Sequence, residues 1–275
     1  MPEGHVIHRY ARSHRAALGG HRIAASSPQG RFAVGAALID GRRLTSVDAH
    51  GKHLFYRWEG AETLHVHLGL YGRFRIHRSD PPPPTPATRL VLSTDEVVVY
   101  LSGPTICEII DPAAEEALRA RLGPDPLVPK RRTGLDPAEA FATNLSRRSI
   151  PIGAALLDQR VIAGLGNIYR AEALFLTGID PHLPAQEVDQ EHALDLWRTS
   201  VTLLRRGVRS GRIVTVEPLD VGAKRRSDLG PTERLYVYKR YGEPCRRCGT
   251  AVMRADMANR MLWWCGACQP AGAGG

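Results

Sequence analysis

Hydrophobic positions follow different patterns along the first half of the chain. Between residues 5 and 18 apolar groups recur at helical spacing, and Gly19-Gly20 ends the helix that they predict. From about residue 22 to residue 110, short apolar runs are separated by turn residues. These runs predict strands at 32–39, 53–58, 63–68, 73–77, 89–93, 96–101 and 105–110. Many short strands with regular turn signals are typical of a β-sandwich or a barrel.

The second half of the chain has mainly helical patterns. After a short helix predicted at 112–122, the Pro-rich and basic segment 123–134 predicts a linker between domains. Further helices are predicted at 136–145, 152–157, 168–176 and 187–208. The sequence therefore predicts an α+β protein with a strand-rich first half and a helical second half.

Composition narrows the function classes that need to be considered. The 275 residues carry 37 Lys and Arg against 28 Asp and Glu, a net charge of +9 that favours a polyanionic partner. No apolar run approaches about 18 residues, so we expect no membrane span. The start Met-Pro-Glu-Gly-His lacks the pattern of a secretory signal, and we expect a cytoplasmic, nucleoid-associated protein. In that compartment cysteines stay reduced and can bind metal.

Four cysteines near the carboxyl end form the strongest local motif. Cys245 and Cys248 make one Cys-x-x-Cys pair, and Cys265 and Cys268 make a second pair after 16 intervening residues. Two such pairs can hold one Zn²⁺ in a closed tetrahedral site, which would fold the hairpin between them rather than catalyse a reaction. Cys107, in a predicted strand, is interpreted as a core residue.

The amino terminus offers a nucleophile. Removal of the initiator methionine would leave Pro2 as a terminal secondary amine, and an α-amine has a lower pKa than a lysine. Such an amine can attack an aldehyde-level carbon and form an iminium ion, with the neighbouring Glu3 moving protons.

Three further segments accompany these features: Gly51-Lys52-His53, the glycine turn with the helix start Gly164-Leu165-Gly166-Asn167, and the final Cys-Gly-Ala-Cys-Gln. With the Met-Pro-Glu start, and in this order, they resemble the formamidopyrimidine-DNA glycosylase/endonuclease VIII family of base-excision repair enzymes.

The resemblance implies an amino-terminal helix with a β-sandwich, followed by a helix–two-turn–helix domain and a zinc finger. The expected division is a catalytic domain at 1–123, a linker at 124–134, a helical domain at 135–235, a zinc finger at 236–270 and a tail at 271–275. The implied partner is damaged duplex DNA, bound by a monomer that carries one structural Zn²⁺.

The same resemblance implies roles for individual residues. Pro2 would attack C1′ of the damaged nucleotide, the strand would break by β- and δ-elimination, and Glu3 would protonate the sugar ring oxygen. Lys52 would contact a phosphate beside the lesion and assist the chemistry. Asn167 and Arg260 would bind the phosphates that flank the extruded nucleotide.

Leu70 and Tyr71 resemble the residues that fill the gap left by the extruded base in the endonuclease VIII branch. This similarity favours oxidised pyrimidines as the bases removed. The alternative is a preference for 8-oxoguanine and formamidopyrimidine. A simple turn between two strands would also explain the segment.

The sequence departs from the family pattern directly after Glu3. The family usually continues with Pro-Glu where this chain has His5 and Val6, so a carboxylate near the site is missing. A second hypothesis is therefore a zinc-dependent protein that binds damaged DNA without cutting it. A third, RNA or membrane-surface binding by the basic face, does not explain Pro2, Lys52 and Asn167 together.

Overall fold

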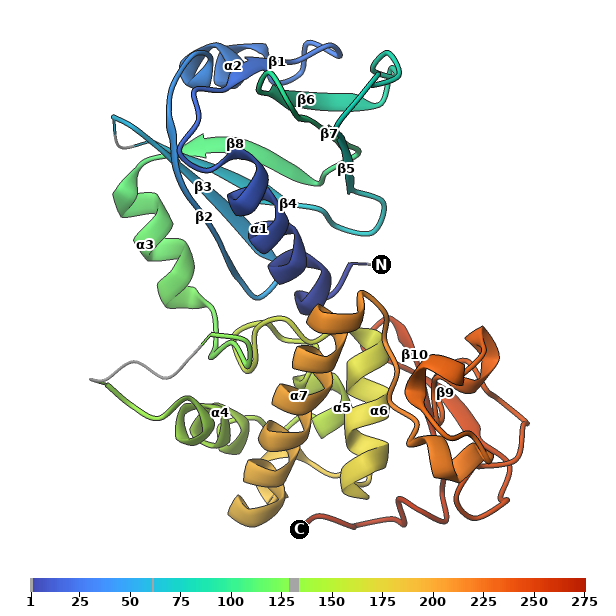
Figure 1. Cartoon of the computed structure of the whole chain (residues 1–275). Coiled ribbons are helices and arrows are strands. Elements are labelled where there is room, and N and C mark those ends of the chain that lie inside the picture. Colours follow the sequence, from blue (N-terminus) through green and yellow to red (C-terminus); the bar gives the residue numbers. More distant parts are fainter. Residues whose placement is uncertain (1, 61, 129–133) are drawn as a thin grey trace. The chain divides into compact units, whose positions relative to one another are not determined.

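The computed structural model describes residues 2–60, 62–128 and 134–275, which divide into the units Met1–Arg121 and Leu122–Gly275. Strands dominate the first unit and helices the second (Figure 1). The predicted α+β class with an amino-terminal β-sandwich is confirmed. Among the described residues, no helix combines the length and the apolar character needed to cross a membrane.

Two four-stranded antiparallel sheets form the first unit, with strand orders β2-β3-β4-β8 and β1-β6-β7-β5. Apolar side chains from both sheets, among them Leu54, Val66, Leu90 and Val99, share one buried core. The strands are β1 (Ala24–Ser26), β2 (Leu44–His50), β3 (His53–Trp58), β4 (Thr63–His67), β5 (Arg73–His77), β6 (Thr88–Ser93), β7 (Val98–Ser102) and β8 (Ile106–Ile110).

Helix α1 (Gly4–Leu18) packs on the sheet formed by β2, β3, β4 and β8. Its residues Ile7, Ala11 and Leu18 are buried in the core, as the helical spacing of the sequence predicts. The unit also contains α2 (Ala33–Ile39) and α3 (Pro112–Arg121).

One predicted strand in this unit is wrong. Residues 33–39 form helix α2, whose Ala36 and Ile39 are buried one turn apart. A short apolar run does not distinguish a strand from a buried helical turn, and its alanines favour the helix. The sequence analysis also missed β1 and β2, because Ala24–Ser26 is very short and Leu44–His50 alternates apolar with small polar residues.

Four α-helices organise the second unit: α4 (Pro137–Ser146), α5 (Ile152–Ala155), α6 (Asn167–Thr177) and α7 (Gln190–Ser210). Asp136 and Asp189 cap α4 and α7 by accepting backbone N–H bonds at 2.9 and 2.8 Å. Left-handed glycines, Gly178 and Gly211, end α6 and α7.

A two-stranded ribbon follows the helices, with β9 (Met253–Met257) paired to β10 (Arg260–Trp264). Short 3₁₀ turns precede it at Ala185–Glu187, Pro218–Val221, Arg226–Asp228 and Pro231–Glu233. Of the predicted linker, residues 129–133 lie outside the described part of the chain. Gly123 and Pro124 hydrogen-bond to Gln159 and Ala163 and so belong to the second unit.

Candidate active site and nucleic-acid interface

The predicted catalytic pair lies at the start of α1. Glu3 is the N-cap of that helix, and its main-chain oxygen accepts the N–H of Val6 at 2.9 Å. The Glu3 side chain is completely buried, while Pro2 is half-buried. Removal of Met1 would leave the Pro2 amine beside this buried carboxylate, which can hold or release a proton without competition from bulk water.

His5 occupies the first turn of the same helix and is 3% exposed. Burial, and to a smaller extent the charge of Arg9, lowers the pKa of His5 to about 4. The imidazole is therefore neutral at pH 7. It supplies a buried polar group, not a second negative charge, beside Glu3.

Lys52 lies in the two-residue turn between β2 and β3. His50 pairs with His53 across this hairpin, and Gly51 has a φ of 57°, the left-handed conformation that such a turn requires. The turn and the start of α1 lie at the same end of the first unit (Figure 1). Lys52 itself is half-buried.

Leu70 and Tyr71 form the turn that joins β4 to β5. Their exposed fractions are 44% and 84%, so they contribute little to the core of this unit. The turn itself is fixed by the Gly72 N–H, which donates to the Leu68 oxygen at 3.0 Å, and by Gly69 at a φ of 64°. Two exposed apolar side chains on a fixed turn are available for a partner.

A glycine turn leads into α6 in the second unit. Gly164 has a φ of 97°, and its N–H donates to the Gln159 side chain at 2.9 Å. Gly166 is the N-cap of α6, and Asn167 is the first helical residue, not the cap.

Asn167 connects α6 to the ribbon. It is 6% exposed, and its Nδ2 donates to the Met261 oxygen at 2.9 Å. The completely buried Arg170 donates to the same oxygen at 3.0 Å and to the Gly153 oxygen at 3.1 Å. Because Met261 follows Arg260, these bonds tie Asn167 to the main chain next to Arg260, the other predicted phosphate ligand.

Arg260 begins β10 directly after the ribbon turn. Ala258 and Asn259 have φ values of 54° and 57°, which close a tight hairpin of the kind that asparagine tolerates. Arg260 pairs with Met257 across the ribbon and is exposed. Arg254, on β9, stacks over the ring of Tyr241 with 4.2 Å to the ring centroid.

The four predicted metal ligands converge at the base of the ribbon. The sulfur atoms of Cys245, Cys248, Cys265 and Cys268 all lie within 4.8 Å of one another. Two of the separations are 3.8 Å, for Cys245–Cys268, and 3.4 Å, for Cys248–Cys265. Zn–S bonds of about 2.3 Å in a tetrahedron place sulfurs roughly 3.8 Å apart, so the set fits zinc.

The fifth cysteine is chemically different. Cys107 lies in β8 against the core of the first unit, and burial raises the pKa of its thiol to about 12. Within the cluster the directions differ: hydrogen bonds from Thr250 lower the pKa of the Cys248 thiol to about 6, whereas burial raises the pKa of the Cys265 and Cys268 thiols. Cys107 therefore remains an unreactive thiol, as the sequence predicts.

The sequence analysis missed Glu172, a completely buried carboxylate on α6. Its oxygens accept the backbone N–H groups of Tyr236, Val237 and Tyr238 at 2.8, 2.9 and 2.8 Å. This bond set holds the segment that enters the first Cys-x-x-Cys pair. The sequence feature that could have identified Glu172 is its position as a charged residue within the apolar run of α6.

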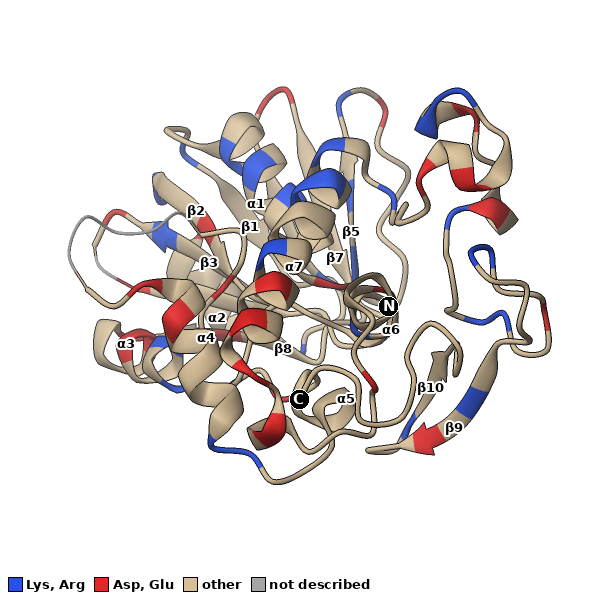
Figure 2. Cartoon of the chain, turned by 90° about the horizontal axis from the view of Figure 1, so that it is seen from below, with Lys and Arg blue, Asp and Glu red and all other residues tan. Residues whose placement is uncertain are grey.

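Charge is distributed unevenly along α7. Figure 2 shows Asp and Glu near its first turns and Arg near its last turns. The acidic residues include Glu191 and Asp195, and the basic residues include Arg205, Arg206 and Arg209. This order complements the helix dipole, and Arg206 also forms an ion pair with Glu217 at 3.0 Å.

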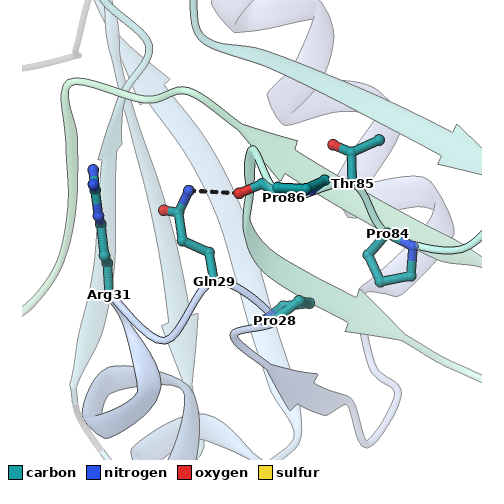
Figure 3. Close-up of a pocket in the computed structure, with 6 residues that line it drawn as sticks. All are labelled: Pro28, Gln29, Arg31, Pro84, Thr85 and Pro86. Atoms are coloured by element: carbon teal, nitrogen blue, oxygen red, sulfur yellow. Dashed lines mark hydrogen bonds between the residues drawn. The ribbon is translucent and has the colours of Figure 1, made fainter.

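One surface hollow of the first unit contains none of the predicted site residues. Its volume is about 540 Å³, and Pro28, Gln29, Arg31, Pro84, Thr85 and Pro86 line it (Figure 3). Gln29 spans the hollow by donating to the Pro86 oxygen at 3.0 Å. The bond fixes the proline loop that the sequence predicts at the surface.

Two family models match this chain in succession. Residues 1–105 match the formamidopyrimidine-DNA glycosylase N-terminal domain, and residues 122–217 match the formamidopyrimidine-DNA glycosylase H2TH domain. Endonuclease 8 1 of Mycobacterium tuberculosis is 42% identical over 274 residues, which cover 98% of this chain and all of the relative. Formamidopyrimidine-DNA glycosylase of Thermus thermophilus is 35% identical over 256 residues, with 86% of each chain covered.

Solved structures give the same result for the fold. The crystal structure of the MutM (Fpg) protein of Thermus thermophilus superposes with a TM-score of 0.77 at 32% identity, covering 98% of this chain and all of the other. The Lactococcus lactis Fpg bound to DNA that contains N7-benzyl-Fapy-dG superposes with a TM-score of 0.79, at the same coverage. Its identity is 22%, so it supports the fold alone.

Proposed function

This chain belongs to the formamidopyrimidine-DNA glycosylase family of base-excision repair enzymes, and from that premise we propose that it is a bifunctional DNA glycosylase and AP lyase. The observation that carries the proposal is Pro2, which becomes a terminal secondary amine once Met1 is removed, followed by the completely buried carboxylate of Glu3. This pair combines a nucleophilic amine with a proton carrier at one point of the fold.

The reaction begins at C1′ of the damaged nucleotide. The Pro2 nitrogen forms a bond to C1′, the bond from C1′ to the base breaks, and Glu3 protonates the ring oxygen as the sugar opens. The resulting iminium ion withdraws electrons, so a proton leaves C2′ and the 3′ phosphate departs. A second elimination releases the 5′ phosphate, and water then frees the amine.

Phosphate binding supports this chemistry. Lys52 contacts a phosphate beside the lesion, and its position in a tight β-turn limits the motion of the main chain beneath it. Asn167 and Arg260 hold the flanking phosphates. The basis for that assignment is the Met261 oxygen, to which Asn167 is bonded and which follows Arg260 directly.

Damaged duplex DNA is the proposed partner, and the protein acts as a monomer. Leu70 and Tyr71 enter the gap that base extrusion leaves, a role supported by their exposure on a fixed turn. Oxidised pyrimidines are the proposed bases, because these two residues resemble the pair in the endonuclease VIII branch and because relatives of that name cover nearly the whole chain. One Zn²⁺ bound to Cys245, Cys248, Cys265 and Cys268 stabilises the ribbon.

A borohydride trapping experiment tests the proposal. Protein with a free Pro2 terminus is mixed with duplex DNA that contains an abasic site, and the iminium ion is reduced. We expect a covalent complex, much weaker trapping by Pro2→Gly, and no strand cleavage by Glu3→Gln. Binding to the lesion duplex without any trapping would favour the hypothesis of a non-cutting damage binder, which the neutral His5 also motivates.

A further inference from the structure

A chain of polar side chains crosses the face of the β2-β3-β4-β8 sheet that is turned away from the core. Alternate residues of β3 point to opposite faces: Leu54 and Tyr56 enter the core, whereas His53 and Phe55 do not. Strand register places His50, His53 and His67 in one row and Phe55, His65 and Glu108 in the next. Four histidines thus gather beside the turn that carries Lys52.

Two hydrogen bonds join three of these side chains in series. Glu108 Oε1 lies 2.9 Å from His65 Nδ1, and His65 Nε2 lies 2.9 Å from His53 Nδ1. The rings of His53 and His65 are nearly parallel, at an angle of 20° and a centroid distance of 5.1 Å. His65 is 2% exposed and also stacks on Phe55 at 5.4 Å, so its position is fixed.

The carboxylate at one end determines where every proton in the chain lies. Glu108 can only accept, so His65 Nδ1 carries the hydrogen that it donates. Burial lowers the pKa of His65 despite the bond to Glu108, so its Nε2 is left with a lone pair. His53 Nδ1 must then donate to His65, and the remaining lone pair of the chain is on His53 Nε2.

His67 has the opposite tautomer. Its Nδ1 accepts the N–H of Gly69 at 3.2 Å, so the neutral ring carries its hydrogen on Nε2. The His67 ring lies 4.8 Å from the His53 ring. Lys52 directly precedes His53 in the turn that the His50–His53 pair closes, so it lies beside this row of histidines. After burial, and for His53 also after the neighbouring histidines, the charge of Lys52 lowers the pKa of both His53 and His67.

We propose that Glu108, acting through His65, positions His53 to accept a hydrogen bond from Lys52 and so orients the lysine toward the DNA phosphate. His53, His65 and Glu108 are positioning residues, because they act through Lys52. The inference deepens the proposed function and rests on it for the role of Lys52. The tautomers and the Lys52 bond are properties of the protein without DNA.

The first part of the test therefore uses the free protein. Nitrogen-15 spectra of the imidazoles should show hydrogen on Nδ1 of His53 and His65 and on Nε2 of His67. Lys52 is one of only four lysines, so its ammonium signal can be assigned by substitution; it should be protected from exchange with water and lose that protection in Glu108→Ala. Hydrogen on His53 Nε2, or an ammonium indifferent to Glu108, would overturn the proposal.

The second part measures strand cleavage at an abasic site under single-turnover conditions. Glu108 is half exposed, so Glu108→Ala should fold normally and lower the cleavage rate about fivefold with little change in Kd, the effect of one hydrogen bond. Glu96→Ala, which removes an exposed carboxylate from the turn between β6 and β7, should leave the rate unchanged. His65→Phe, which keeps the ring stack and loses both nitrogens, should match Glu108→Ala.

A double-mutant cycle separates positioning from a general effect on the fold. In a Lys52→Ala background, Glu108→Ala should cause almost no further loss, because the residue that it orients is gone. A full additional fivefold loss would show that Glu108 does not act through Lys52 and would overturn the proposal. If the wild-type protein cleaves no DNA, the proposed function fails. The spectra of the free protein still decide whether Glu108, His65 and His53 orient Lys52.

Discussion

The side-chain amide of Asn167 donates to the main-chain oxygen of Met261, 2.9 Å away, and so ties the first turn of α6 to the ribbon strand that begins with Arg260. The two residues are 94 positions apart in the sequence. A DNA phosphate bound by Asn167 and Arg260 would therefore meet two residues whose main-chain segments are already tied together in the free protein, which reduces the entropy lost on binding.

This relationship predicts the behaviour of Asn167→Ala. The variant loses a phosphate ligand and one of the bonds that hold Met261, so affinity for lesion duplex should fall about tenfold. Asn144→Ala is a matched control, since Asn144 on α4 donates its amide to the main-chain oxygens of Arg160 and Val161, in the turn between α5 and α6. Fluorescence anisotropy with labelled duplex measures both, and equal losses would contradict the assignment.

The β4–β5 turn should affect function without affecting stability. Leu70 and Tyr71 are exposed, so replacing both with alanine should change the free energy of unfolding by less than about 1 kcal/mol. Excision at a lesion should nevertheless fall at least tenfold, because nothing then fills the gap left by the extruded base. Val34→Ala, at a residue 79% exposed on α2, is the control for loss of a surface apolar group and should retain full activity.

Acid should destabilise the β-sandwich unit. Burial lowers the pKa of His14 to about 3, and of His5 to about 4, against 6.5 when unfolded. Below pH 6.5 the unfolded chain binds protons that the folded chain does not, so stability is complete above pH 6.5 and falls toward the folded pKa values. Each group should remove about 1 kcal/mol between pH 7 and pH 5.5.

Urea unfolding across this range measures the effect. His14→Asn should flatten the pH dependence of the free energy of unfolding. In the wild type, His14 Nδ1 and the Tyr56 hydroxyl are hydrogen-bonded at 2.6 Å, and the amide oxygen of the new asparagine can accept the same hydroxyl hydrogen. His21→Asn, at an exposed histidine, should leave the slope as in the wild type. An unchanged slope in His14→Asn would contradict the prediction.

Zinc removal should abolish DNA binding through the ribbon. Cys265→Ser removes one of four converging thiols, so the protein should lose its metal and the ordered position of Arg260. Cys107→Ser, at a cysteine remote in sequence from the cluster, should keep both metal and affinity. Metal content by mass spectrometry and anisotropy measure the two properties, and unchanged affinity in metal-free Cys265→Ser would exclude a role for the ribbon.

The sequence predicted the parts of the fold in which local patterns determine structure. Two predictions depended only on neighbouring residues: the helix that ends at Leu18 and the metal-binding arrangement of the two Cys-x-x-Cys pairs. The structure confirms the helix and the clustering of the four cysteines. Residues 33–39 were wrongly predicted as a strand, because a short apolar run fits either element.

The roles of residues whose partners are far away in the sequence could not be predicted from the sequence. Glu172 and His65 look like ordinary polar residues until the chain folds and supplies Tyr236–Tyr238 as donors for one and Glu108 as acceptor for the other. Cross-strand register decides which of several histidines meet, and periodicity alone does not give that register.

In the proposed reaction, the Pro2 nitrogen forms a covalent bond to the deoxyribose. Mass spectrometry of the borohydride-reduced complex, after digestion of both protein and DNA, measures the position of that bond directly. We expect a sugar remnant on the peptide that begins with Pro2 in the wild type and none in Glu3→Gln or Pro2→Gly treated alike. A wild-type remnant on Lys52 or another lysine would contradict a bond to Pro2. Full trapping of Pro2→Gly, with the remnant at a residue outside the amino terminus, would contradict it as well.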